Sequence, residues 1–211
     1  MSEPIRISRA ATKKTKPKDS ELAFGTVFTD HMFVMDFQEE KGWYDPRVEP
    51  YGPFPLDPAA AVLHYAQAVF DGLKAFRGRD GQVRLFRPQK HVERLIQSSQ
   101  RLCIPPLDPD LALKSLVTLV GIEKDWVPST VGTSLYVRPT IIASESFLGV
   151  RPAKSYIYYV ILSPVGELAY KGERLVINGG RIGTLTQKLY DAIVGIQYGT
   201  APDTRGWTVP V

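Results

Sequence analysis

The dipeptide Asp80-Gly81 separates two short segments that are rich in apolar and β-forming residues. Asp-Gly favours the positive φ angles of a tight hairpin turn, so residues 73–87 are predicted to form a β-hairpin. Two further strand-like segments occupy residues 134–143 and 155–162. Strands that are joined by tight turns pair antiparallel. The sequence therefore predicts a core that is built on a mainly antiparallel sheet.

Helices are predicted from start signals and from the spacing of apolar residues. Asp57-Pro58 and Asp108-Pro109 each place an N-cap residue before a proline at the first helical position, and another helix is expected after Pro88. A last helix is expected over residues 184–199, where apolar side chains recur at every fourth position: Leu185, Leu189, Ile193 and Ile196. Helices and strands mixed in this order indicate an α+β fold.

The organisation of the chain follows from the same signals. Residues 25–38 form a β-prone run, and residues 43–56, which are rich in Pro, Gly and Tyr, are expected to be an ordered loop. A short hairpin is expected over residues 167–177. We expect a disordered basic tail at residues 1–20, a two-layer domain at residues 21–163 and a hairpin-helix remnant at residues 164–211, which is too short for its own core.

The net charge of +4 comes from one end of the chain. Six basic residues and one acidic residue give residues 1–18 a net charge of +5, so the rest of the chain carries −1. Such a distribution lacks the broad cationic face that nucleic-acid binding requires. Pro17 and the weak apolar periodicity favour disorder for this tail, and a mitochondrial presequence is the alternative interpretation. The expected location is therefore the cytoplasm, with the mitochondrial matrix as the less favoured compartment.

The remaining composition excludes several classes of protein. No apolar run is long enough to span a membrane. Cys103 is the single cysteine, so it cannot form an internal disulfide, and its apolar surroundings predict a buried thiol. We expect no metal site.

Several strings of residues, in a constant order and spacing, resemble the branched-chain amino-acid aminotransferases. These enzymes have fold type IV and use pyridoxal 5′-phosphate (PLP). The strings begin at Phe24 and end at Trp207, and they comprise residues 24–32, 63–76, 85–88, 126–128, 134–139, 148–152, 196–199 and 206–207. The stretch from Leu63 to Phe76 is more similar to the branched-chain enzymes than to D-amino-acid aminotransferases or aminodeoxychorismate lyases.

The resemblance implies a cofactor site and a substrate pocket. Arg94 matches the arginine that binds the phosphate of PLP, and a planar guanidinium suits that contact. Three aromatic residues match the pocket for the leucine, isoleucine or valine side chain: Phe24, Phe70 and Tyr136. Tyr65, Leu148 and Val150 match segments that reach the partner subunit's site in the family's homodimer. Arg138 also lies in a matching motif, where a role in substrate binding and a structural role remain open.

The same resemblance implies that part of the catalytic apparatus is missing. The family's second domain carries the lysine that holds PLP as a Schiff base, and no lysine of this sequence lies in a matching context. The family contains a Ser-Pro-Val string, or a close variant, twice. Around Ser163–Gly166 the upstream residues resemble the first occurrence and the downstream residues resemble the second. An internal deletion between two similar strings explains both flanks. No catalytic residue is assigned, and binding of PLP to this chain is expected to be weak or absent.

Three functional hypotheses follow. In the first, the chain is a truncated branched-chain aminotransferase, whose intact relative transfers an amino group between Leu, Ile or Val and 2-oxoglutarate. In the second, the retained domain is a non-catalytic dimerisation module that pairs with itself or with an intact subunit. In the third, the intact protein contains residues that this sequence omits.

Overall fold

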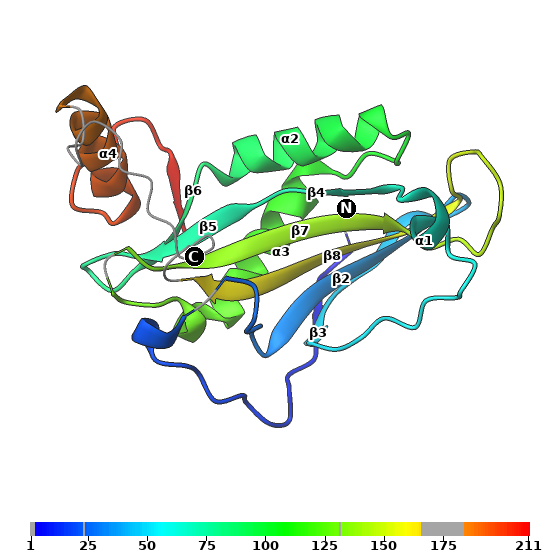
Figure 1. Cartoon of the computed structure of the whole chain (residues 1–211), viewed down its shortest axis with the longest axis horizontal. Coiled ribbons are helices and arrows are strands. Elements are labelled where there is room, and N and C mark those ends of the chain that lie inside the picture. The colour runs from blue at the N-terminus through cyan, green and yellow to red at the C-terminus, as the bar shows by residue number, and fades with distance from the viewer. Residues whose placement is uncertain (1–2, 23, 131, 166–183) are drawn as a thin grey trace, which may run out of the picture.

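The computed structural model describes residues 3–22, 24–130, 132–165 and 184–211 (Figure 1). In this part of the chain one sheet runs through the molecule in the order β1-β3-β2-β8-β7-β5-β6-β9, and β4 pairs with β7 beside β5. Its strands are β1 (Arg6–Ile7), β2 (His31–Gln38), β3 (Gly42–Pro50), β4 (Ala68–Phe70), β5 (Leu73–Arg77), β6 (Val83–Phe86), β7 (Ser134–Ala143), β8 (Ser155–Val165) and β9 (Thr208–Pro210). The pairing of β1 with β3 is parallel and the others are antiparallel. The predicted α+β class is confirmed.

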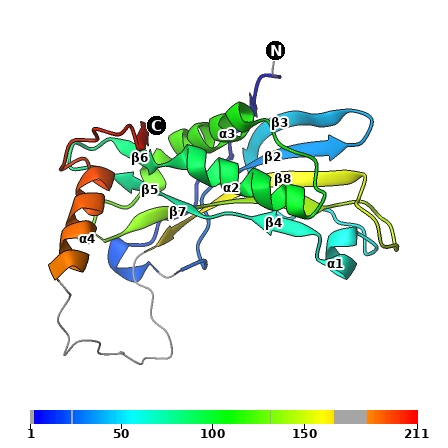
Figure 2. The same ribbon diagram turned by 90° about the horizontal axis from the view of Figure 1, so that it is seen from above.

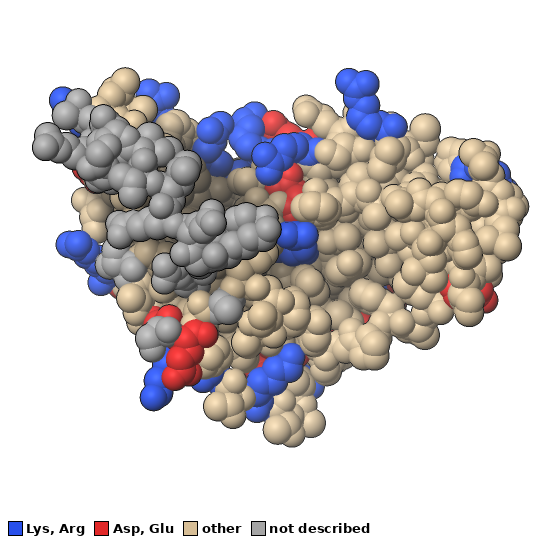
Figure 3. Space-filling model, viewed as in Figure 1, with Lys and Arg blue, Asp and Glu red and all other residues tan. Residues whose placement is uncertain are grey.

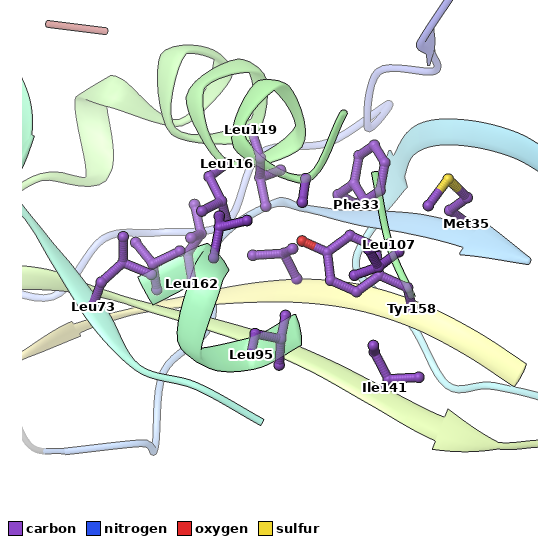
Figure 4. Packing of buried hydrophobic residues seen from close by; sticks show 14 of the residues in the cluster. Phe33, Met35, Leu73, Leu95, Leu107, Leu116, Leu119, Ile141, Tyr158 and Leu162 are labelled. Atoms are coloured by element: carbon purple, nitrogen blue, oxygen red, sulfur yellow. The ribbon is translucent and has the colours of Figure 1, made fainter. Parts of the chain in front are cut away.

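Two long helices, α2 (Pro88–Arg101) and α3 (Pro109–Ile122), pack against each other and against the sheet (Figure 2). The core lies between them and the strands. Figure 4 shows Leu95 of α2 and Leu116 of α3 facing buried side chains of the sheet, including Phe33 and Leu162. The hydroxyl groups of Tyr158 and Ser115 lie 3.0 Å apart inside this core, so each has a hydrogen-bond partner.

Both helices begin where the sequence predicts. Pro88 occupies the first turn of α2, and the carboxylate of Asp108 accepts a hydrogen bond of 2.7 Å from the Leu111 N–H at the start of α3. Val92 and Leu95 of α2 are buried. The apolar spacing of the sequence places Leu102 on the same face, but Leu102 follows the end of the helix and is exposed.

The prediction of a loop at residues 43–56 is wrong for its first half, because residues 43–50 belong to β3. Pro46 lacks a backbone N–H and argues against a regular strand. The structure accommodates it at a bulge, where the register between β2 and β3 shifts and Asp45 adopts a φ of 56°. Trp43 and Val48, on either side of the bulge, pack against the core.

The helix expected to start at Asp57-Pro58 is much shorter than the helical spacing of its apolar residues predicts, which extends through Leu63, Ala66, Val69 and Phe70. Only α1 (Ala61–Tyr65) is helical, and Ala66 ends it with a φ of 52°. Val69 and Phe70 belong instead to β4, which pairs with β7. The pairing with β7 therefore overrides a helical pattern that the local sequence supports.

The N-terminal segment differs from the disordered tail expected at residues 1–20. Arg6 and Ile7 pair with β3, and the N–H groups of Ala10 and Lys14 donate to His31 and Asp30. The ammonium group of Lys14 donates to the Thr29 carbonyl at 2.9 Å and lies 4.3 Å from the centre of the Tyr51 ring. The composition of this segment predicts disorder because composition contains no information about distant partners. Here the edge of β3 and hydrogen-bond acceptors at residues 29–31 hold the segment in place. A short 3-10 helix, η1 (Asp19–Glu21), follows it.

The prediction of a buried Cys103 is also wrong. The residue is exposed and has a φ of 54°. It follows the end of α2 at Arg101, in the turn that leads to α3, so the apolar spacing of the helix does not extend to it.

The C-terminal part of the chain joins the same sheet. The predicted helix is present as α4 (Thr184–Gln197), and it lies at the opposite end of the sheet from α1 (Figures 1 and 2). Three members of its apolar stripe are exposed: Leu185, Leu189 and Ile193. β9 then pairs with β6, and the Tyr198 hydroxyl donates to the Thr133 carbonyl at 2.9 Å. The hairpin expected over residues 167–177 lies outside the described residues.

Candidate functional site

The turn between β4 and β5 places a buried carboxylate beneath α2. Asp71 follows the last residue of β4, and its side chain is only 3% exposed. Arg94 of α2 donates to it through both Nε and one terminal nitrogen, at 2.5 and 2.7 Å. His91, one helical turn earlier on the same face, contacts the carboxylate through Nδ1 at 2.8 Å. The N–H of Gly72 completes the set at 2.7 Å.

These contacts keep Asp71 ionised. Burial alone would raise the pKa of Asp71, but the hydrogen bonds from Arg94, His91 and the Gly72 N–H, together with the charge of Arg94, outweigh burial and lower the pKa to about 2. The same contact raises the pKa of Arg94. Asp71 therefore remains a carboxylate over the physiological range and Arg94 remains a cation.

Gly72 allows a very close approach between the turn and β7. A Cβ atom at this position would lie 2.0 Å from the hydroxyl oxygen of Tyr136, so any other residue would force Tyr136 or the turn to move. The Tyr136 hydroxyl accepts a hydrogen bond of 3.1 Å from Nε of Arg138. The guanidinium of Arg138 in turn lies 4.3 Å from the centre of the Phe70 ring. Two arginines thus flank the Asp71-Gly72 turn.

An apolar cavity of about 200 Å³ adjoins Tyr136. The ring of Phe24 contacts Tyr136 edge-on, with 5.2 Å between ring centres, and both residues line the cavity together with Phe28 and Arg138. Ser163 also lines it, and its buried hydroxyl has no hydrogen-bond partner among the described residues. Aromatic walls with a few polar groups are typical of a small-molecule pocket.

The structure divides the predicted site residues into two groups. Arg94, Phe70 and Tyr136 lie around the Asp71-Gly72 turn, and Phe24 joins them through its contact with Tyr136. Tyr65 and Val150 line a separate cavity of about 410 Å³, and Leu148 lies beside them in the segment that follows β7. Tyr136 is near the start of β7, so at about 3.3 Å per residue most of that strand separates the two groups. Val150 is 96% exposed and the other two are also exposed.

Two further residues at this turn, Asp71 and His91, carry no prediction from the sequence. Asp71 lies within the string that resembles the aminotransferases, whereas His91 lies outside every such string. The only local signal was the Asp-Gly pair that follows a β-prone segment. Arg138, whose role the sequence left open, contacts both Phe70 and Tyr136.

Other classes of site receive little support in the described part of the chain. No cluster of three or more His, Cys, Asp or Glu side chains that could hold a metal ion occurs there. Within the same residues, no helix has the length and apolar character needed to cross a membrane. The face in Figure 3 shows basic and acidic groups next to each other near its centre, rather than one extended cationic surface.

Comparisons with known proteins connect these observations. No family model matches the chain. Branched-chain-amino-acid aminotransferase 2 of Bacillus subtilis (strain 168) is 56% identical over 168 residues, which are 80% of this chain and 46% of that protein. Branched-chain-amino-acid transaminase 1 of the same organism is 52% identical over 167 residues, 79% of this chain and 47% of that protein. The chain is a relative of the branched-chain-amino-acid aminotransferases.

A mammalian protein is also similar in sequence, and a solved structure is similar in fold. The cytosolic branched-chain-amino-acid aminotransferase of Mus musculus is 44% identical over 166 residues, 79% of this chain and 43% of that protein. The Escherichia coli branched-chain amino acid aminotransferase has a similar fold, with a TM-score of 0.50 and 20% identity over 71% of this chain and 44% of that chain. The chain spans about half the length of the curated aminotransferases that it matches.

Proposed function

We propose that the chain is a partial branched-chain aminotransferase that supplies one wall of a PLP and substrate site. Its intact relatives are expected to transfer an amino group between Leu, Ile or Val and 2-oxoglutarate. The strongest support is the identity of 56% over 168 residues to an aminotransferase. The expected compartment is the cytoplasm, where the exposed thiol of Cys103 would stay reduced.

The residues around the Asp71-Gly72 turn fit the phosphate end of PLP. PLP, when bound, supplies an electron sink for the carbanion that amino transfer requires. The side chain of Arg94 is 62% exposed, and Asp71 occupies only one edge of its guanidinium. The other edge is available for the two-point contact that arginine makes with a phosphate.

The neighbouring residues suit a branched aliphatic substrate. Phe24 and Tyr136 form an apolar wall beside the cavity of about 200 Å³, and the guanidinium of Arg138 contacts the rings of both Tyr136 and Phe70. Such a wall excludes water from an aliphatic side chain and favours Leu, Ile or Val over polar amino acids. Arg138 places a cation at the edge of this wall, where a carboxylate of the substrate could be held.

We further propose that this chain alone does not complete the reaction, because a PLP-dependent transaminase needs a lysine to hold the cofactor and move the proton. Lys74 and Lys188 are exposed. Lys74 is opposite Tyr136 in the pairing of β5 with β7, so it is the lysine to examine first. Lys171 lies outside the described residues.

The test combines labelling with an activity assay. The full chain is incubated with PLP, reduced with borohydride and digested, and modified lysines are mapped by mass spectrometry. The expected results are no stoichiometric modification at any one lysine and no turnover of leucine with 2-oxoglutarate. One stoichiometric site together with turnover would contradict the proposed incompleteness. Measuring the mass of the whole protein in its source cells decides whether the protein has a longer form that this sequence omits.

A second candidate function, a dimerisation module, is favoured by the exposed apolar group at Tyr65, Leu148 and Val150. Exposed apolar surface of this kind is typical of a contact with another protein. Labelled chain mixed with an intact branched-chain aminotransferase should form a mixed dimer in sedimentation analysis. Val150→Glu should abolish that dimer, whereas Lys41→Glu, in the exposed turn between β2 and β3, should not. No mixed dimer at micromolar concentration would reject this function.

A further inference from the structure

We propose that Asp71 is a positioning residue that, assisted by His91, fixes the guanidinium of Arg94 in the orientation in which it binds the phosphate of PLP. This inference rests on the proposed function, since it concerns the same phosphate site. Asp71 itself would not touch the cofactor. It acts through Arg94, whose side chain is 62% exposed and keeps one edge of its guanidinium free for a ligand.

The contact between Asp71 and Arg94 defines both the position and the plane of the guanidinium. Two donors, Nε and one terminal nitrogen, bind the two carboxylate oxygens at 2.5 and 2.7 Å. A two-point contact of this kind prevents rotation about the last bonds of the side chain. The other terminal nitrogen makes no hydrogen bond to any described residue, so it is available to a ligand.

The carboxylate of Asp71 is itself held by the backbone of the sheet. The Asp71 N–H donates to the Pro139 carbonyl of β7 at 3.0 Å, and the Gly72 N–H donates to the carboxylate at 2.7 Å. Gly72 has no room for a Cβ atom against Tyr136, so the turn cannot shift toward β7. These contacts fix the position of the Asp71 carboxylate. Without that carboxylate, an exposed arginine on a helix would sample many rotamers.

His91 supports the same arrangement. Its Nδ1 lies 2.8 Å from the Asp71 carboxylate and 3.3 Å from a terminal nitrogen of Arg94. A carboxylate accepts hydrogen bonds and does not donate, so Nδ1 must carry a proton that it donates to Asp71. Nδ1 then cannot accept from Arg94. The imidazole thus fixes the carboxylate and blocks one side of the space into which the guanidinium could rotate.

If only the charge of Asp71 mattered, replacing Asp71 would change the affinity for phosphate in the opposite direction from that expected for a positioning role. Asp71 carries a negative charge next to a site that would bind a dianionic phosphate, so its charge alone opposes binding. Replacing it with a neutral residue should then strengthen phosphate binding. If Asp71 positions Arg94, the same replacement should weaken binding, because the guanidinium must be ordered when the ligand binds. The sign of the change therefore separates the two interpretations.

The experiment measures the affinity of the full chain for PLP and for pyridoxal, which lacks the phosphate, by isothermal titration calorimetry at pH 7.5. Asp71→Asn should weaken PLP binding by about 3- to 10-fold, the scale of ordering one long side chain. Pyridoxal binding should not change. Inorganic phosphate, added as a competitor, should displace PLP less effectively from Asp71→Asn than from the unsubstituted chain. Far-ultraviolet circular dichroism checks that the variants are folded.

Further variants separate positioning from a purely structural role. Arg94→Ala should weaken PLP binding at least as much as Asp71→Asn, and the double variant should match Arg94→Ala, because Asp71 acts only through Arg94. Asp71→Glu keeps the charge and moves the carboxylate, so it should not restore affinity. His91→Asn is the mildest change and keeps a side-chain N–H donor, so it should retain most of the affinity.

The outcomes that overturn the inference are distinct from those that overturn the proposed function. If Arg94→Ala weakens PLP binding but Asp71→Asn binds PLP as tightly as the unsubstituted chain or more tightly, positioning is wrong and the phosphate site stands. Additive losses in the double variant would also reject it. If the unsubstituted chain binds PLP no better than pyridoxal, both the phosphate site and its positioning are rejected.

Discussion

His31 donates a hydrogen bond through Nδ1 to the carboxylate of Glu123, a residue 92 positions later in the chain. Both side chains are almost completely buried. The other ring nitrogen, Nε2, accepts a hydrogen bond of 2.8 Å from the Ala10 N–H. Nε2 is therefore unprotonated, and the imidazole is neutral with its proton on Nδ1. One side chain thus joins the N-terminal segment, the start of β2 and the end of α3.

The first prediction follows from the burial of Glu123. His31→Leu should lower the free energy of unfolding by about 3–5 kcal/mol, because it leaves a buried carboxylate without its partner. His31→Leu combined with Glu123→Leu should recover part of that loss, since no charge then remains buried. Urea denaturation of the two variants and the unsubstituted chain measures both values. Equal stability of the single and double variants would show that Glu123 does not depend on His31.

The second prediction concerns the acid dependence of stability. The pKa of Asp71 is about 2 in the folded protein, below its usual value of 3.8. The ionised group therefore stabilises the fold fully above about pH 4, and this contribution is lost as the pH falls to about 2. At about 1.4 kcal/mol per pKa unit it amounts to about 2 kcal/mol.

Asp71→Asn lacks this titration. The difference in unfolding free energy between the unsubstituted chain and Asp71→Asn should shrink by about 2 kcal/mol between pH 6 and pH 2. Urea titrations at a series of pH values measure the difference. A difference that stays constant across this range would mean that Asp71 titrates normally.

The third prediction concerns the contact between Gly72 and Tyr136. Gly72→Ala places a methyl group 2.0 Å from the Tyr136 hydroxyl, so it should destabilise the fold by about 1–3 kcal/mol. Adding Tyr136→Phe removes that oxygen and should recover part of the loss. The recovery should be incomplete, because a ring carbon also lies at 2.7 Å. Thermal melts of the three proteins provide the measurement.

Gly52→Ala is the matched control, because its nearest neighbour would lie 4.0 Å away and its backbone requires no positive φ. It should leave the melting temperature almost unchanged. A loss equal to that of Gly72→Ala would indicate a general cost of replacing glycine in this protein.

The fourth prediction concerns the exposed apolar stripe of α4. Leu185, Leu189 and Ile193 present apolar side chains to solvent, and such a stripe promotes association. The purified chain should therefore form larger species as its concentration rises. Leu189→Lys with Ile193→Lys should reduce the association, and Thr186→Lys, also exposed on α4, should not. Sedimentation velocity over a dilution series distinguishes these results, and a monomer at every concentration would contradict the prediction.

The elements that the sequence predicted well have signals within a few residues. α3 begins at Asp108-Pro109 because the carboxylate of Asp108 binds a helical N–H and proline suits the first turn. The hairpin of β5 and β6 forms around Asp80-Gly81, where Gly81 has a φ of 78°. In these cases the local chemistry and the final fold agree, so short-range rules are sufficient.

The elements that the sequence missed depend on distant partners. β3 tolerates Pro46 only because a bulge against β2 removes the need for its N–H. β4 forms a strand because β7 offers an edge, although its own residues fit a helical pattern. The position of the Asp71 carboxylate beneath Arg94 depends on how α2 crosses the sheet, and nothing local to Asp71 indicates that crossing.

The described sheet is bordered by the first and last segments of the chain, since β1 and β9 end its strand order. During synthesis on a ribosome, β6 emerges more than a hundred residues before its neighbour β9, which spans Thr208–Pro210. That edge of β6 therefore exposes unpaired backbone groups throughout translation of the intervening residues, the period in which another nascent chain could pair with it. Termination of translation shortly before residue 208 would leave this edge of β6 unpaired permanently.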